Sequence, residues 1–307
     1  TDSFGKELKE IQYNFSGDAV LNVNANNDII SSNPTNSQFA AIETATSKTV
    51  RMKLNGHTMD INVKGELGGY NNTTHGIKVT SGDLIMENVG GLNINVSNAK
   101  KSYGILVQGD DGYANGKASL TVDNGDTMDK AVKIRLQNIS NPQAAIFVKD
   151  NTGKASLDIK GMVDIETNGD AYGLYMNGGK MNIGGGSIVA HGARAIDAYK
   201  GILTINSKYD ENGNIEAADK VLEVDINGDI RSYGNNKTAI GLNSKGSTFT
   251  GAIHALDGGK VDMLLSNGAL WTNKLANSQS GFVGSTVNQL VGGATANEAG
   301  YILQRDS

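Results

Sequence analysis

A four-residue phrase recurs along this chain: a small residue, an aliphatic residue, any residue, and a second aliphatic or small apolar residue. Its six copies are Gly76-Ile77-Lys78-Val79, Gly104-Ile105-Leu106-Val107, Ala145-Ile146-Phe147-Val148, Gly173-Leu174-Tyr175-Met176, Ala195-Ile196-Asp197-Ala198 and Ala239-Ile240-Gly241-Leu242. Their starts are 28, 41, 28, 22 and 44 residues apart. Repeats of a few tens of residues with uneven spacing are typical of a solenoid with insertions. The phrase therefore constrains the fold more than the function.

Strictly alternating apolar and polar residues lie between the copies of the phrase. Examples are Leu92–Val96, Leu120–Val122, Leu157–Ile159, Met181–Ile183 and Leu203–Ile205. Alternation indicates strands, and the Gly, Asn or Asp that closes each run tolerates positive φ at a corner. Strands this short pair best with the equivalent strand one coil away. We therefore predict an all-β fold, a right-handed parallel β-helix (solenoid) with about three short strands per coil.

The apolar positions of the phrase are expected to stack into buried columns. The second position predicts one column, and the fourth predicts its neighbour: Ile77, Ile105, Ile146, Leu174, Ile196 and Ile240, then Val79, Val107, Val148, Met176, Ala198 and Leu242. The spacings of 41 and 44 residues fit either one coil with an insertion or two degenerate coils.

Three segments depart from the repeat. Residues 1–15 place Phe4, Leu8 and Ile11 at helical spacing, which predicts a short amphipathic N-terminal cap over the open end of the solenoid. The β-helix is then expected over 16–307, weakly patterned from 272. Within it, Asn212-Gly213 predicts a protruding hairpin over Ser207–Lys220.

Composition excludes several classes of function. The net charge is −5 with no basic stripe, so the electrostatic signature of nucleic-acid binding is missing. The absence of cysteine excludes disulfides and thiol chemistry. No apolar run approaches the roughly 18 residues of a membrane-spanning helix, and no leader is visible at Thr1. We expect no cofactor.

Catalytic and metal-binding patterns are weak. The four histidines lack zinc-ligand spacing, and the sequence has neither a GxSxG elbow nor a GxxxxGK[ST] loop. Two oxygen-rich loops, Asp123–Lys130 and Tyr209–Glu216, do not fit the calcium-loop register. A polysaccharide lyase or hydrolase built on a β-helix needs clustered carboxylates, or carboxylates with Lys and Arg, on one outer groove. The acids on or beside strands are Asp158, Asp164, Glu166, Asp225 and Asp229. Because outward alternation alone produces such acids, we expect no enzyme and no metal site.

One outward feature suggests a binding surface. The third position of the phrase points away from the core and reads Lys78, Leu106, Phe147, Tyr175, Asp197 and Gly241. Three consecutive coils would show Leu106, Phe147 and Tyr175 as an exposed apolar strip, which favours a contact surface rimmed by Lys78 and Asp197. Loop residues are further candidates: Asp110, Asp111, Tyr113, Asp210 and Asn212.

The stretch Val261–Thr272 (VDMLLSNGALWT) resembles the closing segment of type V autotransporter passenger domains. In that family an alternating strand, an Asn-Gly turn and a single Trp, here Trp271, recur near the end of the β-helix. Thr248–Gly251 before it and Ser285–Leu290 after it fit the same arrangement.

This resemblance implies an extracellular passenger on a bacterial cell surface, attached to the outer membrane through a C-terminal barrel that this sequence does not include. Such a passenger crosses the membrane unfolded, which agrees with the absence of cysteine. Passengers without an added enzyme domain are mostly adhesins, haemagglutinins or biofilm factors, and their partners are surface proteins or glycans of host cells or bacteria, or further copies of themselves. A polysaccharide-degrading enzyme and a structural stalk remain the alternatives.

Overall fold

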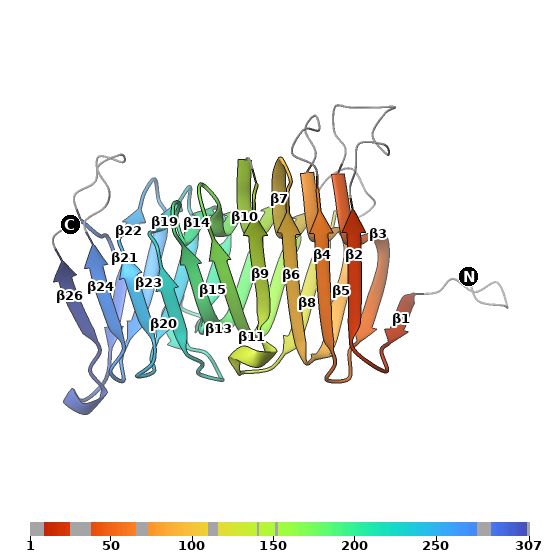
Figure 1. The fold of residues 1–307 in the computed structure, drawn as a ribbon. Coiled ribbons are helices and arrows are strands. Elements are labelled where there is room, and N and C mark those ends of the chain that lie inside the picture. The colour runs from red at the N-terminus through yellow and green to blue at the C-terminus, as the bar shows by residue number, and fades with distance from the viewer. Residues whose placement is uncertain are drawn as a thin grey trace.

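The computed structural model describes residues 9–24, 38–65, 73–109, 116–139, 141–150, 153–274 and 284–305. A single 24-stranded sheet winds through these residues, and its strands pair in parallel with the strands of the next coil. Figure 1 shows the result as an elongated stack with β1 (Glu10–Asn14) at one end and β26 (Tyr301–Arg305) at the other. The predicted all-β fold and its parallel β-helix are confirmed.

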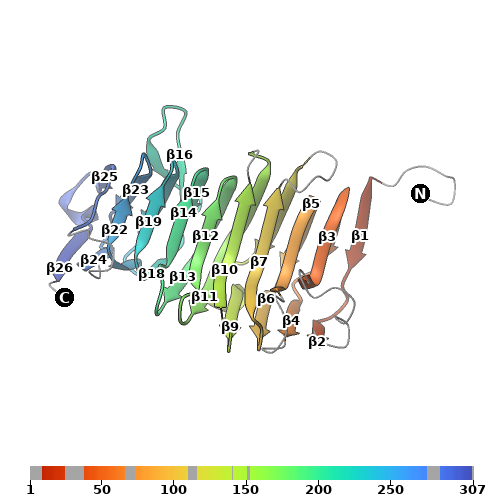
Figure 2. The ribbon, with the colours of Figure 1, turned by 90° about the horizontal axis from the view of Figure 1, so that it is seen from above.

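Each coil has three faces, here called A, B and C, and one strand or strand segment lies on each (Figure 2). Face A is built from β3 (Gln38–Lys53), β5 (Thr73–Val89), β7 (Lys101–Gly109), β10 (Asn141–Asp150), β12 (Tyr172–Asn177), β14 (Ile196–Tyr199), β19 (Ile230–Tyr233) and β22 (Ile253–Ala255).

Strands β3 and β5 bend and continue onto face B. Besides these two segments, face B contains β1, β8 (Ala118–Asn124), β11 (Ala155–Thr167), β13 (Lys180–Ala190), β15 (Ile202–Ile205), β20 (Lys237–Leu242), β23 (Lys260–Leu265) and β25 (Gln289–Gly292).

Strands β11 and β13 in turn bend onto face C. The other face C strands are β2 (Ala19–Asn24), β4 (Thr58–Lys64), β6 (Gly91–Ser97), β9 (Val132–Gln137), β18 (Val224–Asn227), β21 (Thr248–Gly251), β24 (Leu270–Lys274) and β26. Helical structure in the described residues is limited to two three-residue 3-10 turns, η2 (Met128–Lys130) and η4 (Ala296–Glu298).

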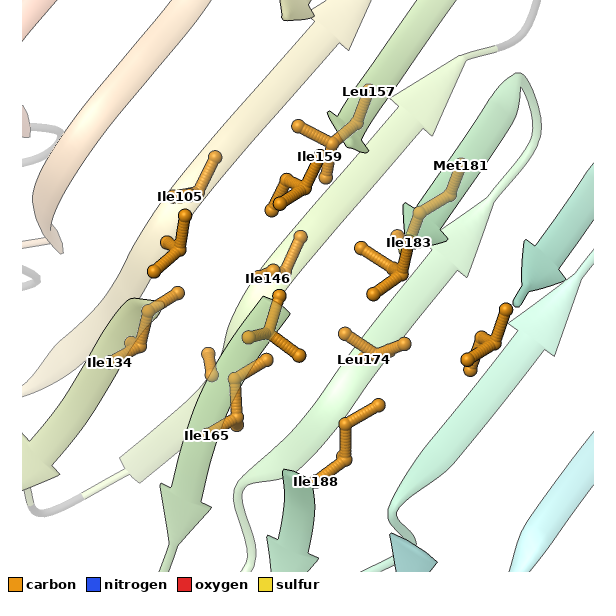
Figure 3. Close-up of a cluster of buried hydrophobic side chains, with 14 of the residues drawn as sticks. Ile105, Ile134, Ile146, Leu157, Ile159, Ile165, Leu174, Met181, Ile183 and Ile188 are labelled. Atoms are coloured by element: carbon orange, nitrogen blue, oxygen red, sulfur yellow. The ribbon is translucent and has the colours of Figure 1, made fainter. Parts of the chain in front are cut away.

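The core consists of aliphatic columns from all three faces, as Figure 3 shows for the middle of the stack. Ile146 on face A, Ile159 on face B and Ile165 on face C all lie inside and are fully buried. Burying such a side chain contributes about 1.5–3 kcal/mol. Repetition of these columns along the axis is what holds a thin solenoid together.

The small residue that opens each phrase has a packing reason. A Cβ on Gly104 would lie 2.4 Å from Ile134 Cγ2 and 2.7 Å from the Ala145 carbonyl oxygen. Gly76 and Gly173 make equally close approaches to Ile94 and Ile188 of face C. The first position therefore points into the core at a place where face C already fills the space.

Five of the six phrase copies lie in one register on face A, and the sixth does not. Ile77, Ile105, Ile146, Leu174 and Ile196 pair in succession, and the column continues through Ile230 and Ile253. Ile240 instead pairs with Ile205 and Met263 on face B. The predicted places of Ile240, Gly241 and Leu242 in the face A columns are therefore wrong, because alternation alone does not say which face a strand occupies.

The two long spacings have different causes. The 41 residues between Gly104 and Ala145 form one coil whose length comes from insertions, because β7 pairs directly with β10. The 44-residue spacing compares strands on two different faces. One insertion in that interval is the hairpin of β16 (Ser207–Tyr209) and β17 (Ile215–Ala217), which pair antiparallel. The predicted hairpin is confirmed.

The two ends of the solenoid are both formed by strands. Residues 10–14 form a strand that pairs in parallel with β3, so the helical spacing that includes Ile11 does not produce a helix there. Phe4 and Leu8 lie outside the described residues. At the other end, β25 and β26 continue the stack on faces B and C, although the sequence from 272 onward is weakly patterned. In both cases pairing with an existing strand edge outweighs local sequence preference.

Corner residues follow the predicted chemistry. Apart from Lys200, the non-glycine residues with positive φ in the described chain are asparagines and one aspartate: Asn55, Asn88, Asn98, Asn138, Asn206, Asn235, Asn267 and Asp257. These are the residue types that best tolerate the left-handed region.

Candidate functional site

The predicted strip lies on the outer side of face A in one unbroken register. Lys78 pairs with Leu106, Leu106 with Phe147, Phe147 with Tyr175, and Tyr175 with Asp197. The column extends at both ends, to Glu43 and to Arg231. The structure therefore brings together all five residues that the sequence nominated for this strip.

The strip is not an exposed apolar surface, and that expectation is wrong. Leu106 is 4% exposed and Phe147 is 7% exposed, and they form a small apolar cluster with Ala144, separate from the main core. Three half-buried tyrosines pack against this cluster: Tyr103, Tyr172 and Tyr175. The apolar side chains thus support the tyrosines that reach the surface.

Four rings stack along the solenoid axis. The centroids of His75 and Tyr103 are 5.5 Å apart, those of Tyr103 and Phe147 are 5.4 Å apart, and those of Phe147 and Tyr175 are 4.5 Å apart, with interplanar angles of 6°, 21° and 13°. Phe147 therefore has both ring faces covered. Such offset stacks contribute about 0.5–1.5 kcal/mol per pair beyond burial.

Sequence reasoning missed most of the residues at this surface. Tyr199 and Tyr233 are cross-coil partners two residues beyond the strip, with ring centroids 4.8 Å apart. A usable signal was present: His75, Tyr103 and Tyr172 each directly precede the glycine of a phrase. We define the tyrosine face as the half-buried outer residues Tyr103, Tyr172, Tyr175, Tyr199, Tyr233, Arg194 and Arg231.

A buried carboxylate anchors the arginines of the tyrosine face. Asp197 is 0% exposed, and Arg231 donates to it from Nε at 3.1 Å and from Nη2 at 2.6 Å. Arg194 Nη1 lies 3.4 Å from the same carboxylate. The Arg231 guanidinium also sits 4.5 Å from the Tyr233 ring centroid. The bidentate pair fixes the guanidinium in place beside the tyrosines.

Three phenols of this face, those of Tyr103, Tyr175 and Tyr233, stay neutral. Burial raises the pKa of Tyr103 to about 12. Burial, together with the negative charge of Asp197, also raises the pKa of Tyr175 and that of Tyr233. The face therefore offers neutral hydroxyls and cationic guanidinium groups to a partner.

The loop candidates divide into two groups. Asp110, Asp111 and Tyr113 lie outside the described residues. Asp210 and Asn212 form the exposed turn of the hairpin, where the Asp210 carboxylate accepts hydrogen bonds from the backbone amides of Asn212 and Asn214. The Asn214 side-chain amide also donates to this carboxylate, and this bond, together with the backbone bonds, lowers the pKa of Asp210 and leaves it a turn-stabilising group.

A second concave feature lies at the corner between faces B and C. A groove of about 560 Å³ separates the loop after β8 from the return arm of the hairpin. Its charged lining consists of Asp123, Asp126, Asp158, Asp219, Lys160, Lys208 and Lys220. Lys208 pairs with Asp219 at 2.5 Å, and Lys220 pairs with Asp126 across the groove. Asp158, one of the acids noted in the sequence, is thus in a groove.

Other predicted acids are placed elsewhere. Asp164 and Glu166 pair with Arg135 on face C, and Asp225 and Asp229 hydrogen-bond to the next coil at Thr248 and Ala252. In the part of the chain that the structure describes, no group of three or more His, Asp or Glu side chains is arranged to hold a metal ion. The same residues include no helix with the length and apolarity to cross a membrane.

The fold places the chain in the class of parallel β-solenoids. No protein-family model, no curated protein and no solved structure matches the chain.

Proposed function

We propose that this protein is a bacterial cell-surface adhesin and that the tyrosine face is its binding surface. The observation that carries the proposal is the gathering of five half-buried tyrosines and two arginines on one side of five successive coils, those of β7, β10, β12, β14 and β19. Only 6% of the chain is aromatic, so this concentration is a local feature of the surface.

Tyrosine and arginine suit such a surface for physical reasons. Both are enriched at protein interfaces because each presents a large, fairly rigid contact area with a polar end. Here they are already held in place, Tyr175 by stacking on Phe147 and Arg231 by Asp197. Less side-chain freedom is then lost on binding, which favours affinity.

The geometry favours a protein partner over a sugar at this face. Stacking a sugar needs an open ring face, and Phe147 has both faces covered while Tyr103 and Tyr175 each contact it. The ring edges and phenol hydroxyls of these tyrosines remain available to contact a partner. The repeat along the axis lets several weak contacts act together, as in avidity.

The resemblance of Val261–Thr272 to autotransporter passengers supports a place on the bacterial surface and a partner on host cells or on other bacteria. A stiff solenoid that displays side chains at fixed spacing fits that role. A purely structural stalk would not need tyrosines and arginines gathered on one side. The tyrosine face therefore favours an adhesin over a stalk.

The test is binding of the labelled chain to cultured epithelial cells and to bacterial cells. Tyr172→Ser and Tyr199→Ser remove half-buried tyrosines of the face and keep Phe147 and Leu106 in the sequence, and we expect each to weaken binding at least tenfold. Tyr13→Ser and Tyr301→Ser are matched controls, because these tyrosines are exposed on β1 and β26, away from the face. Equal binding by all four variants would refute the proposal.

A polysaccharide-degrading enzyme remains the second candidate, and the groove between faces B and C is the observation that favours it. A general acid in such enzymes needs a raised pKa. Here Lys208 lowers the pKa of Asp219 instead. Because three of the four groove carboxylates, those of Asp123, Asp126 and Asp219, are ion-paired, we favour binding over cleavage there.

A further inference from the structure

We propose that the groove between faces B and C is a second binding site, separate from the tyrosine face, and that it takes a neutral, hydroxyl-rich oligosaccharide. The groove has a floor, two walls and a mixed-charge lining, and each of these is built by identifiable residues.

Gly125 and Gly184 line the groove, and Gly161 lies in the coil between them. A Cβ on Gly161 would lie 2.1 Å from the Gly125 carbonyl oxygen, and one on Gly184 would lie 2.2 Å from the Lys160 carbonyl oxygen. Only glycine allows the corners of successive coils to approach this closely. The corners of successive coils therefore pack closely here, between the two insertions that flank them.

Buried asparagines fix the two walls. Asn124 donates to the carbonyls of Lys130 and Met162, at 3.1 and 2.8 Å, and so closes the loop that contains η2. Asn206 exchanges two 2.8 Å hydrogen bonds with the backbone of Leu222, which closes the base of the hairpin. Lys220 then joins the hairpin arm to Asp126 of the other wall. Both walls are held by the stack itself, so the groove is preformed.

The length and volume suit a short chain molecule. The corners of β8, β11, β13 and β15 follow one another at the inter-strand spacing of about 4.8 Å, so the floor extends roughly 14 Å along the axis. A volume of about 560 Å³ lies within the range of ligand sites. A smaller hollow of about 300 Å³ shares Asp123, Asn124 and Gly125 and continues along the same corner.

The lining selects the chemistry of the ligand. Four carboxylates and three ammonium groups offer acceptors and donors side by side, which suits hydroxyl groups that both donate and accept. The carboxylates of the groove would repel a polyanion, and its lysines would repel a polycation. The ion pairs that line the groove are solvent-exposed, so a ligand can replace them by its own hydrogen bonds at little cost.

A buried hydroxyl adds a further polar group to the lining of the groove. Ser207 lines the groove, is 4% exposed, and its Oγ has no hydrogen-bond partner among the described residues. Buried hydroxyls are normally satisfied.

The experiment is calorimetric titration of the intact chain with a panel of neutral gluco-, manno- and galacto-oligosaccharides. Oligogalacturonate, chitosan oligomers and a mixed-charge peptide serve as probes of the wrong chemistry. We expect a neutral oligosaccharide to bind, and Asp158→Asn and Lys160→Met each to weaken it at least tenfold. Thermal unfolding verifies that both variants fold.

Asp60→Asn is the matched control. Asp158 accepts a hydrogen bond from Asn182 of the next coil at 2.6 Å, and Asp60 accepts one from Asn93 of the next coil at 2.7 Å, but only Asp158 lines the groove. Asp60→Asn should bind like the unaltered chain. Binding that is unchanged in Asp158→Asn and Lys160→Met overturns the site, and so does the absence of any neutral ligand. Preference for a charged probe or the peptide overturns the ligand class. If the unaltered chain releases new reducing ends from an oligosaccharide and Asp158→Asn does not, the groove cleaves its ligand, and a purely binding role is overturned.

Discussion

Tyr209 Oη donates a 2.8 Å hydrogen bond to Oδ2 of Asp262, and this contact joins the hairpin to the outer surface of face B. Asp262 is buried, and its Oδ1 has no hydrogen-bond partner among the described residues. Ile215 of the hairpin packs beside it with Ala239 and Leu264. The hairpin therefore lies against β20 and β23 as a strap, and one wall of the groove depends on it.

Removing the phenol hydroxyl should loosen this strap. Tyr209→Phe leaves the buried Asp262 carboxylate without the donor at Oδ2, and we expect the free energy of unfolding to fall by about 2 kcal/mol. Asp262→Asn keeps an oxygen that accepts from Tyr209 and removes the buried charge, so its cost should be smaller. Urea unfolding measures both, and a larger loss for Asp262→Asn than for Tyr209→Phe would contradict this account.

Stability should fall in acid because of His75. This ring is 1% exposed, and neither of its nitrogens has a hydrogen-bond partner in the described part of the chain. Burial, reinforced by the positive charge of Lys78, lowers the pKa of His75 to about 3. The unfolded chain, with a histidine pKa near 6.5, binds the proton more readily. The stability contributed by the neutral His75 is therefore fully present above about pH 6.5 and is lost as the pH falls toward 3.

At pH 5 the loss from His75 should be about 2 kcal/mol relative to pH 7, from 1.36 kcal/mol per pKa unit. His75→Phe keeps the ring stacked on Tyr103 and removes the titration, so its unfolding free energy should change less between these pH values. A smaller slope will remain, since burial also lowers the pKa of His254. Identical slopes for His75→Phe and the unaltered chain would rule out this origin.

The small first position of the phrase can be tested at one glycine. Gly104→Val places branched carbons where Ile134 Cγ2 and the Ala145 carbonyl already lie, and overpacking of this kind costs about 1–3 kcal/mol. Gly17→Ala is the matched control, because nothing lies within 4 Å of a Cβ there. Thermal unfolding should show a clear decrease for Gly104→Val alone. Equal melting temperatures would mean that the first position is free of packing constraint.

Substitutions of the two partners in the buried ion pair of the tyrosine face should cost different amounts of stability. Arg231→Met leaves the fully buried Asp197 carboxylate with only Arg194, at 3.4 Å, and should cost about 3 kcal/mol. Asp197→Asn removes the buried charge, keeps an acceptor for Arg231, and should cost about 1 kcal/mol. Chemical unfolding of the two variants distinguishes these costs. The reverse order of these costs would show that burial is more unfavourable for the Arg231 guanidinium than for the Asp197 carboxylate.

The column Lys78–Leu106–Phe147–Tyr175–Asp197 shows how far sequence patterning reaches. Its register was predictable because strand side chains alternate with a period of two and because equivalent strands of a solenoid stack in register. The corners were predictable for a similar reason, since Asn and Gly tolerate positive φ. Both properties are local and are repeated in every coil.

Other features depended on contacts between coils. The phrase at Ala239 looks like the others, yet it lies on face B, because every face of a solenoid needs the same alternation. Leu106 and Phe147 point outward but are covered by tyrosines from neighbouring coils, and no local pattern gives the exposure of an outward side chain. Likewise, the groove exists because two insertions, 94 residues apart at Asp126 and Lys220, reach the same corner. The sequence by itself determined the solenoid and its strand register, which arise from local periodicity; the tertiary structure decided the faces, the tyrosine surface and the groove, which arise from stacking of coils that are distant in sequence.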